Sequence, residues 1–326
     1  MLGRLRRMVC AVRSLIEARR TEDKASVARY WSRHAAAPDA FSPLVYWLAL
    51  PEVQRRVLAK AVGALSYASW PAWCVGEFLK GRTPARRMLS VGCGTGSLER
   101  ELAGLSAFLE CDAIDLAPGA IAAAREKALG AGIRGIRYRV ADIETLPDLG
   151  PAYDAVWFNS SLHHIRELEA VCGRVAGWLR PDGLLFVNEY VGPSRFAFGR
   201  RQRQAMEAAF DLIPRRYRRS FLSGRPDEWQ ETVRIPNPRE VAAADPSEAV
   251  RSGEIMAVLQ RSFRTEVERP LGGTLLQFVL SGIAGNFRAD DPGSIAVLEM
   301  LFAIEDALME TGDIGSDFAL IVARTR

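Results

Sequence analysis

Short apolar runs alternate with stretches of helical periodicity through the middle of the chain. In the helical stretches apolar residues recur every three or four positions, as Leu98, Leu102 and Leu105 do. Strands that alternate with helices pair in parallel through right-handed crossovers, so we expect a doubly wound α/β sheet. The predicted strands are 88–92, 111–115, 136–140, 154–158 and 184–190, and the predicted helices between them are 97–105, 118–130 and 167–179.

Both ends of the chain depart from this alternation. Residues 1–85 show no strand pattern, and their aromatic-rich helical segments predict a lid over the sheet. After the fifth strand, the pattern predicts helices at 199–213, 247–260, 274–286 and 294–310 and strands at 261–268 and 317–324. The predicted units are an N-terminal helical lid (1–85), a central ligand-binding core (86–192), a helical insertion (193–260) and the C-terminal part of the core (261–326).

Composition is that of an ordinary globular protein, with 48% hydrophobic and 25% charged residues. The five cysteines are scattered without a Cys-x-x-Cys pair, and only three histidines are present. We therefore expect neither a disulfide framework nor a metal centre, and a reduced, cytoplasmic setting. Neither a signal peptide nor an apolar run near the roughly 20 residues of a membrane span is expected.

Arginines concentrate in two segments. Residues 1–20 hold six arginines and one acid, and residues 195–219 hold eight arginines and two acids, although the whole chain carries only +4. Such segments suit an anionic partner, and they equally suit solvated helix faces. The helix predicted at 1–20 fits contact with an anionic membrane surface, or a packing role in the monomer or a homodimer.

Three alternating glycines follow the first predicted strand. Gly92, Gly94 and Gly96 allow a tight turn that brings the backbone close to a ligand, and the next helix begins with free N–H groups. Asp115 ends the next strand, about 20 residues further on, where an acid holds a ribose diol. A dinucleotide fingerprint would need glycine at Ser97, which argues against a nicotinamide oxidoreductase.

The glycine spacing resembles that of class I S-adenosylmethionine-dependent methyltransferases. Three further segments are similar to the motifs of that family, and they are 140–143, 153–159 and 179–187. The whole-chain pattern, including 188–194, 245–252 and 316–318, resembles a poorly described bacterial group of the type 11/12 methyltransferases. The resemblance implies a Rossmann-like, doubly wound seven-stranded sheet, mostly parallel with an antiparallel last strand, and S-adenosylmethionine as cofactor.

The resemblance also implies cofactor roles. Gly92, Cys93, Gly94 and Gly96 would pass under the methionine, and Asp115 would accept from the ribose hydroxyls. Leu116 and Ile143 would pack on adenine, Asp142 would accept from its amino group, and Asn159 would lie on the same rim. One departure is Ser90, two positions before the first glycine, where the family usually has an acid. The methionine amino group therefore lacks one expected partner.

Three residues are candidates for a catalytic base. His163 and His164 follow the fourth strand and Glu189 ends the fifth, so all three lie near the cofactor rim, although a structural role for the histidine pair is a serious alternative. Adjacent histidines diverge and no third ligand is evident, so we expect no metal. The predicted substrate-binding residues are Tyr30, Trp31, Tyr190, Arg195, Arg200 and Arg201.

The sequence thus predicts methyl transfer from S-adenosylmethionine to a small, sugar-linked or lipid-linked acceptor. We expect O-methylation of an anionic substrate because of the arginines after the fifth strand. N- or C-methylation and a catalytically silent cofactor-binding protein are the alternatives. Nucleic acid is not an expected partner, because the chain has no Asn-Pro-Pro-Tyr motif after the fourth strand and no RNA-binding module.

Overall fold

A computed structural model describes residues 21–35, 42–63, 67–222, 225 and 227–326. The basic helix predicted at 1–20 lies outside the described residues, so its contact with a membrane or a second copy stays a prediction. Residues 21–35 are helical and form the first described element, called here the N-terminal helix. No described helix is long and apolar enough to cross a membrane.

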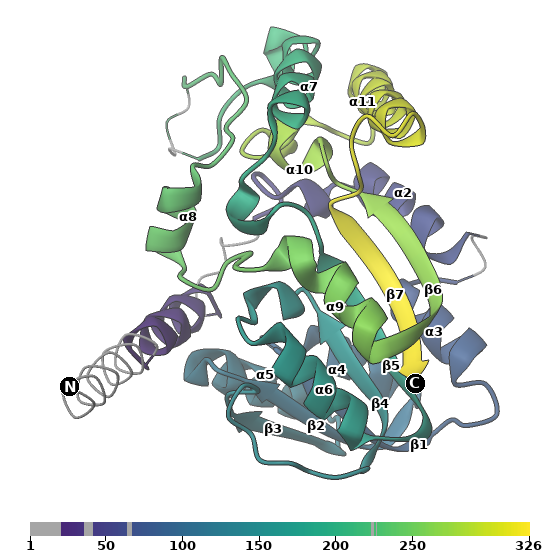
Figure 1. The fold of residues 1–326 in the computed structure, drawn as a ribbon. Helices are drawn as coiled ribbons and strands as arrows, with labels where there is room; N and C mark the ends of the chain where they lie inside the picture. The colour runs from purple at the N-terminus through teal and green to yellow at the C-terminus, as the bar shows by residue number, and fades with distance from the viewer. Residues whose placement is uncertain (1–20, 36–41, 64–66, 223–224, 226) are drawn as a thin grey trace, which may run out of the picture.

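The core is a seven-stranded sheet with the order β3-β2-β1-β4-β5-β7-β6 (Figure 1). Strands β1 to β5 pair in parallel, whereas β7 runs antiparallel to both β5 and β6. This topology confirms the predicted doubly wound, Rossmann-like sheet with an antiparallel last strand. The strands are β1 Ala85–Val91, β2 Phe108–Asp115, β3 Ile136–Val140, β4 Tyr153–Asn159, β5 Leu179–Tyr190, β6 Phe263–Gly272 and β7 Phe318–Thr325.

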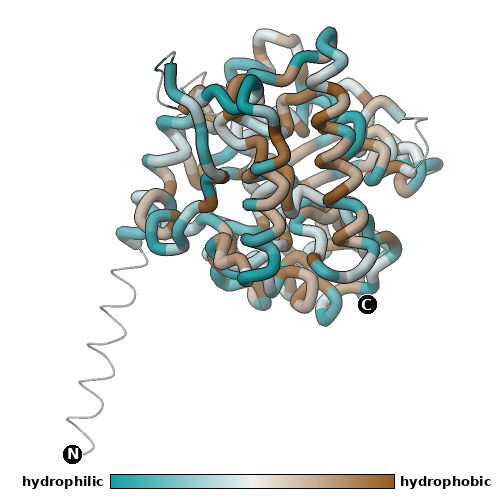
Figure 2. Tube along the Cα trace, turned by 90° about the horizontal axis from the view of Figure 1, so that it is seen from above, coloured by the Kyte–Doolittle hydropathy of each residue, from teal (hydrophilic) through white to brown (hydrophobic). Residues whose placement is uncertain are grey.

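Helices cover both faces of the sheet, which explains why the central strands are buried almost continuously. Alternate residues of β1 and β4 point to opposite faces, so Leu89 and Val156 pack against one set of helices and Met88 and Trp157 against the other. The helices of the first face are α6 Leu168–Trp178 and α9 Ile255–Ser262, and those of the second are α3 Trp70–Phe78, α4 Ser97–Gly104 and α5 Pro118–Gly130. Hydrophobic segments accordingly run through the interior of the molecule (Figure 2).

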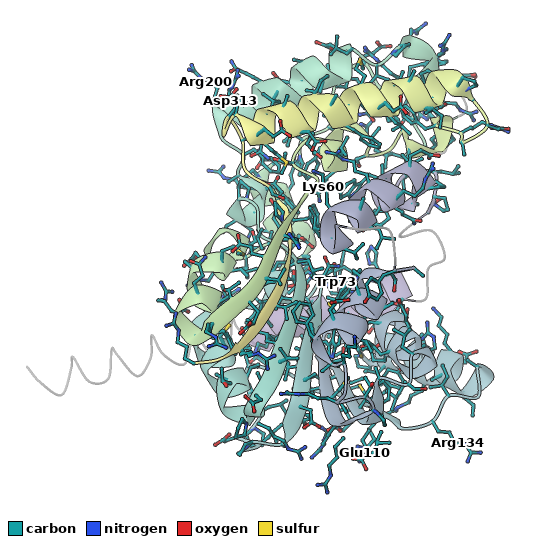
Figure 3. The ribbon with its side chains drawn as sticks, turned by 90° about the vertical axis from the view of Figure 1, so that its right-hand side faces the viewer. Lys60, Trp73, Glu110, Arg134, Arg200 and Asp313 are labelled. Atoms are coloured by element: carbon teal, nitrogen blue, oxygen red, sulfur yellow. The ribbon has the colours of Figure 1, made fainter. Side chains whose placement is uncertain are left out.

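A second apolar layer stands above the C-terminal ends of the parallel strands (Figure 1). We call it the cap, and it consists of α7 Arg200–Asp211, α8 Pro238–Ala244, α10 Leu276–Val279 and α11 Pro292–Glu310. Helix α2, Pro51–Val62, joins the cap to the sheet, because Arg56 and Lys60 both form ion pairs with Asp306 of α11. Figure 3 shows α2 between α11 and the sheet, with Lys60 labelled on the side of the cap.

The predicted helix 247–260 is wrong at its start. Residues 246–249 form a turn, Ala249 has a φ of +47°, and the α-helix begins only at Ile255. The Val250 N–H donates to the carbonyl of His163 instead of continuing a helix. The predicted helix 274–286 likewise shrinks to the four residues of α10 followed by a single 3₁₀ turn at 284–286.

The predicted boundary at residue 260 does not follow the packing. Helix α9, assigned to the insertion, packs with α6 in the apolar layer of the core sheet. Helices α10 and α11, assigned to the core, pack with α7 in the cap. The cap is therefore assembled from two separate stretches of sequence, which a division by residue number alone does not reveal.

Asp317, just before β7, gives a pH-dependent contribution to stability. It is 4% exposed and its Oδ2 accepts from Gln202, yet burial raises its pKa to about 7 from 3.8. Because the folded-state pKa is raised, ionisation costs stability as the pH rises from about 4 to about 7. Asp317→Asn keeps the acceptor oxygen and avoids this cost. Its stabilisation, measured by urea unfolding, should therefore be larger at pH 8 than at pH 5 by about 2–3 kcal/mol.

The control for this experiment is Asp313→Asn, on an exposed carboxylate close by in the chain. Its effect should be nearly equal at the two pH values. An Asp317→Asn stabilisation that is also equal at both values would contradict the ionisation argument.

Candidate functional site

A cavity of about 1050 Å³ opens at the C-terminal ends of β1, β2, β4 and β5, beneath the N-terminal helix. Its wall brings together residues that are far apart in sequence. Of the predicted cofactor-binding residues, it includes Gly92, Cys93, Gly94, Asp115, Leu116, Asp142, Ile143 and Asn159. It also includes His163, His164, Tyr190 and Trp31, but not Gly96, Glu189, Tyr30, Arg195, Arg200 or Arg201.

The glycine turn after β1 has the left-handed backbone that the spacing predicts. Gly92, Gly94 and Gly96 have φ values of +68°, +52° and +79°. A Cβ at Gly92 would clash with Ser161, whereas a Cβ at Gly94 would meet nothing within 4 Å. Gly94 thus exposes its backbone to the cavity, where a ligand can approach closely. Gly96 is the N-cap residue of α4 and lies outside the cavity wall.

Asp115 holds this turn from the end of β2. Its Oδ2 accepts from the Gly94 N–H at 2.9 Å and its Oδ1 from the Ala117 N–H at 2.8 Å. Burial raises the pKa of Asp115, and these backbone bonds oppose the rise. The carboxylate is therefore fixed at the rim with lone pairs left over, which is what acceptance from a ribose diol requires.

We expect Asp115→Ala to weaken the binding of S-adenosylhomocysteine by about 1.5–3 kcal/mol, because hydrogen bonds to a charged group are lost. Isothermal titration calorimetry measures this directly. The matched control is Glu110→Ala, which removes an exposed carboxylate from the same strand at the other end of the sheet (Figure 3). Equal affinities of the Asp115→Ala variant and the wild type would remove Asp115 from the cofactor site.

The adenine end of the predicted site carries an unexpected cation. Lys24 of the N-terminal helix forms ion pairs with Asp142 and, at 2.9 Å, with Glu144. Lys24 and both acids line the cavity. An adenine amino group that binds Asp142 would therefore share or displace this ammonium group. Asn159, on the same rim, accepts from Asn188 at 2.8 Å through its side-chain oxygen.

Glu189 organises the turn that carries both histidines. It is completely buried at the end of β5, and its Oε1 accepts from the N–H groups of Ser161 and Leu162. Its Oε2 accepts from Nδ1 of His163 at 2.6 Å. The 3₁₀ turn Leu162–His164 therefore starts on the Glu189 carboxylate. Glu189 does not reach the cavity, so it is a positioning residue rather than a free base.

A second chain of hydrogen bonds fixes His164. The Ser247 hydroxyl donates to Asp245 at 2.7 Å, which leaves its oxygen to accept from Nδ1 of His164 at 2.9 Å. Trp31 of the N-terminal helix donates to the other oxygen of Asp245 at 2.9 Å and packs edge-on against the His164 ring. With the proton on Nδ1, the Nε2 atom of His164 is an unprotonated acceptor on the cavity wall.

The two histidines have opposite protonation preferences. Burial alone would lower the pKa of His163, but the Glu189 carboxylate raises it to about 9. Burial and the charge on His163 lower the pKa of His164. At neutral pH His163 is therefore an imidazolium paired with Glu189, and His164 is neutral. His164 is the histidine that can take a proton from an acceptor.

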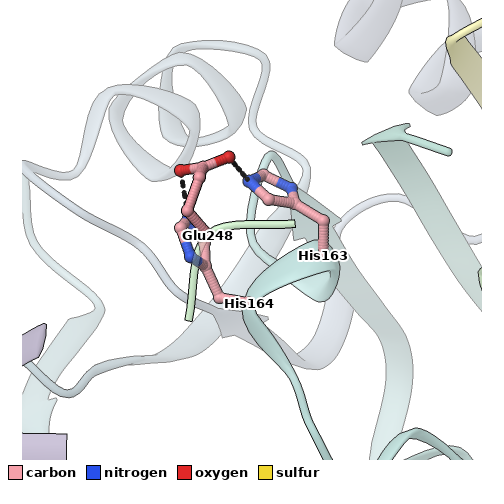
Figure 4. A group of neighbouring side chains, drawn as sticks. All are labelled: His163, His164 and Glu248. Atoms are coloured by element: carbon pink, nitrogen blue, oxygen red, sulfur yellow. Dashed lines mark ion pairs between the residues drawn. The ribbon is translucent and has the colours of Figure 1, made fainter. Parts of the chain in front are cut away.

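The reasoning that adjacent histidines diverge is wrong for this turn. The two rings lie 4.2 Å apart, and Glu248 faces both, with its oxygens 3.6 Å from Nε2 of His163 and 3.9 Å from Nε2 of His164 (Figure 4). The candidate ligand atoms all lie within 4.8 Å of one another, close enough to hold an ion. The expected lack of a metal stays a prediction, because an ion pair between His163 and Glu248 also accounts for the arrangement.

The predicted substrate-binding arginines do not reach the cavity. Arg195 donates to the carbonyls of Pro246 at 2.5 Å and Glu248 at 2.9 Å, so it fixes the 246–249 turn instead. Arg201 pairs with Asp313 at 2.5 Å, and Arg200 lies beside Asp313 at the outer edge of the cap (Figure 3). The three arginines follow β5 in the sequence, but none lines the cavity, and Arg200 and Arg201 belong to the cap helix α7.

Of the three aromatic residues that we predict to bind substrate, two line the cavity and one does not. Trp31 and Tyr190 line the cavity, whereas Tyr30 packs on His34, with ring centroids 3.9 Å apart, outside the wall. Tyr190 donates its hydroxyl to the Pro193 carbonyl, so only its ring is available to a ligand.

Sequence reasoning missed four polar residues of the site. Ser247 and Glu248 fall at the start of the predicted helix 247–260, and neither Asp245 nor Glu99 of α4 is among the predicted site residues. The signal for Glu99 was available, because it precedes Leu102 by three residues and shares the inward face of α4. Nothing local indicates that residues 245–248 meet residues 163–164, since they are about 80 positions apart.

Comparisons with known proteins agree with this geometry. Residues 89–187 match the family described as "Methyltransferase domain". They span the end of β1 to most of β5, including the glycine turn, Asp115, Asp142 and both histidines. The chain contains a class I S-adenosylmethionine-dependent methyltransferase domain. S-adenosylmethionine is its cofactor, and the residues of the cavity fit it, because the open backbone at Gly94 and the fixed Asp115 carboxylate suit its methionine and ribose groups.

Relatives of this methyltransferase domain include O-methyltransferases. The chain is 37% identical over 106 residues to "Ubiquinone biosynthesis O-methyltransferase" of Xanthomonas campestris pv. campestris, which covers 32% of this chain and 43% of that protein. It is 30% identical over 182 residues to the protein of the same name from Methylocella silvestris, which covers 55% and 64%. The chain thus spans less than two thirds of either relative.

Among solved structures, the geranyl diphosphate C-methyltransferase of Streptomyces coelicolor A3(2) is similar in fold. The match covers 93% of this chain and 98% of that chain, at 15% sequence identity and a TM-score of 0.49.

Proposed function

We propose that this protein transfers the methyl group of S-adenosylmethionine to a hydroxyl oxygen of a small molecule. The observation that carries the proposal is the position of His164 on the wall of the cavity that also contains the glycine turn and Asp115, with its Nδ1 held by the Ser247 hydroxyl so that Nε2 is left as the proton acceptor. A donor site and a proton acceptor share one space, which is what O-methylation needs.

The chemistry assigns a step to each group. The cofactor supplies a methyl group on a positively charged sulfur. Held by the glycine turn and Asp115, it would give this methyl group to an acceptor oxygen in line with the carbon–sulfur bond, and the electron pair of that bond would stay on sulfur. His164 takes the hydroxyl proton at Nε2, while Ser247 and Asp245 hold the ring through Nδ1 and stabilise the imidazolium that forms.

The acceptor in this proposal is neutral rather than anionic. The arginines that suggested an anion lie outside the cavity, and its wall carries more acids (Asp23, Glu99, Asp115, Asp142, Glu144 and Glu248) than lysines and arginines (Lys24, Lys127 and Arg166). These charges would repel a phosphate or carboxylate but favour the cationic sulfonium. Aromatic rings line another part of the wall, so the acceptor is expected to have an apolar body, as a lipid-linked or aromatic alcohol has. Those ring residues are Tyr46, Trp47, Phe196 and Phe318.

A second candidate is N-methylation of an amine. It is favoured by the same carboxylates, because an ammonium substrate is attracted to them and can lose its proton to His164. The position of the methyl group in the product separates the two candidates.

The test is an acceptor screen with purified protein and S-adenosylmethionine, read by the formation of S-adenosylhomocysteine and by mass spectrometry of the product. Neutral alcohols and phenols with apolar bodies should be methylated at oxygen, and their phosphorylated counterparts should not. If cofactor binding is normal and only anionic acceptors or amines are turned over, the proposal of a neutral hydroxyl acceptor is wrong.

A further inference from the structure

Glu99 is a buried acid at the edge of the cofactor cavity with no role in the proton transfer above. It lies in the first turn of α4, directly after the glycine turn, and its relative exposure is 0%. It is nevertheless one of the residues that line the cavity, as are Ser90, Gly92 and Cys93. Ser90, on β1, donates its hydroxyl hydrogen to Oε1 of Glu99.

The second oxygen of this carboxylate is unsatisfied. Oε2 is buried and has no hydrogen-bond partner among the described residues. Within the part of the chain that the structure describes, Glu99 also forms no ion pair, and its neighbour Arg100 donates instead to the carbonyl of Thr95. A buried carboxylate oxygen without a partner is costly, and burial accordingly raises the pKa of Glu99 to about 7. A cationic or donor group of a ligand placed at this oxygen would remove the cost.

We propose that Glu99 binds the α-ammonium group of the methionine part of S-adenosylmethionine. The inference rests on the proposed function, because it needs that cofactor in this cavity. Ser90 occupies the β1 position where an acid would face the methionine, and its hydroxyl orients a carboxylate supplied by the neighbouring helix. Glu99 thus takes over a charge that β1 lacks, and its free Oε2 is the atom that accepts from the ammonium group.

A pair of ligands isolates this contact. S-adenosylhomocysteine carries the α-ammonium group, whereas 5′-methylthioadenosine has the same nucleoside but lacks the amino-acid part. Calorimetric titration of both into wild type, Glu99→Gln and the double variant Ser90→Asp/Glu99→Gln separates amino-acid recognition from nucleoside recognition. Glu101→Gln, on an exposed acid of the same helix that accepts from Ser69, is the matched control.

Glu99→Gln should weaken S-adenosylhomocysteine binding about 10–100-fold and leave 5′-methylthioadenosine binding within about twofold. The double variant should recover much of the loss, because the acid then stands on β1. Glu101→Gln should bind both ligands as wild type does.

Two results would overturn the inference while the proposed function stands. One is unchanged S-adenosylhomocysteine affinity in Glu99→Gln, and the other is an equal loss for both ligands, which indicates a structural role for Glu99. A wild-type protein that binds neither ligand would overturn the proposed function itself, and with it this assignment.

Discussion

We expect His164→Gln to lower the rate of methyl transfer by about 10²–10⁴-fold, because a positioned base contributes on that scale. Glutamine keeps a polar side chain of similar reach but cannot take a proton at neutral pH. The contacts proposed for the cofactor are with the glycine turn and Asp115 and not with this side chain, so the affinity for S-adenosylhomocysteine should stay within about threefold. Single-turnover kinetics with an acceptor from the screen measure the rate, and calorimetry measures the affinity.

The pH profile gives an independent readout of the same base. The wild-type rate should fall in acid as His164 becomes protonated, at a pH below the ordinary imidazole range, because burial and the charge of His163 lower its pKa. The residual activity of the His164→Gln variant should not show this decrease of the rate in acid. Ser247→Ala, which removes the partner of Nδ1, should reduce the rate less than His164→Gln does. A His164→Gln enzyme with wild-type rates would eliminate this histidine as the base.

Glu189→Ala should lower the free energy of unfolding by about 3–5 kcal/mol and abolish activity. The substitution leaves the backbone N–H groups of Ser161 and Leu162 and the imidazolium of His163 buried without the acceptor that they share. Uncompensated buried charges and donors are among the few causes of such large effects in single variants. Urea unfolding monitored by circular dichroism measures the change.

Glu189→Gln distinguishes the two contributions of this side chain. The amide oxygen can still accept from the two backbone N–H groups, whereas its NH₂ group then faces Nδ1 of His163 and the negative charge is gone. We expect a smaller loss of stability than in the alanine variant, and a pKa of His163 that falls from about 9 toward or below its ordinary value. Equal stabilities of the alanine variant and the wild type would show that the turn does not depend on Glu189.

The core of the fold was predictable because each signal is local. The apolar runs mark strands buried on both faces, and the alternation with helices fixes their parallel pairing. The glycine turn and Asp115 follow from spacing alone, and the structure brings them together through the bond between Asp115 and Gly94. The rim rule for parallel sheets collects Gly92, Asp115, Asp142, Asn159 and Glu189, and all of them except Glu189 line the cavity.

The rest of the site depends on contacts between distant segments. Residues 245–248 look like a helix start, but Arg195 binds three of their carbonyls and fixes a turn against the histidines. Arg195 itself looked like a ligand for an anion. The sequence shows that an arginine is charged but not what its guanidinium binds. The guanidinium of Arg195 donates to backbone carbonyls instead of to a substrate.

The N-terminal helix contacts two parts of the site, because Lys24 pairs with Asp142 on the cavity wall and Trp31 donates to Asp245, the partner of Ser247. Adenine bound at Asp142 would disturb the first contact, and the second contact would help to orient the proposed base, His164. The exchange of S-adenosylhomocysteine for S-adenosylmethionine and the deprotonation of His164 would then both depend on the position of the N-terminal helix. Turnover by this enzyme should consequently follow an ordered kinetic scheme, in which the acceptor enters only a donor-loaded protein and the demethylated donor leaves last.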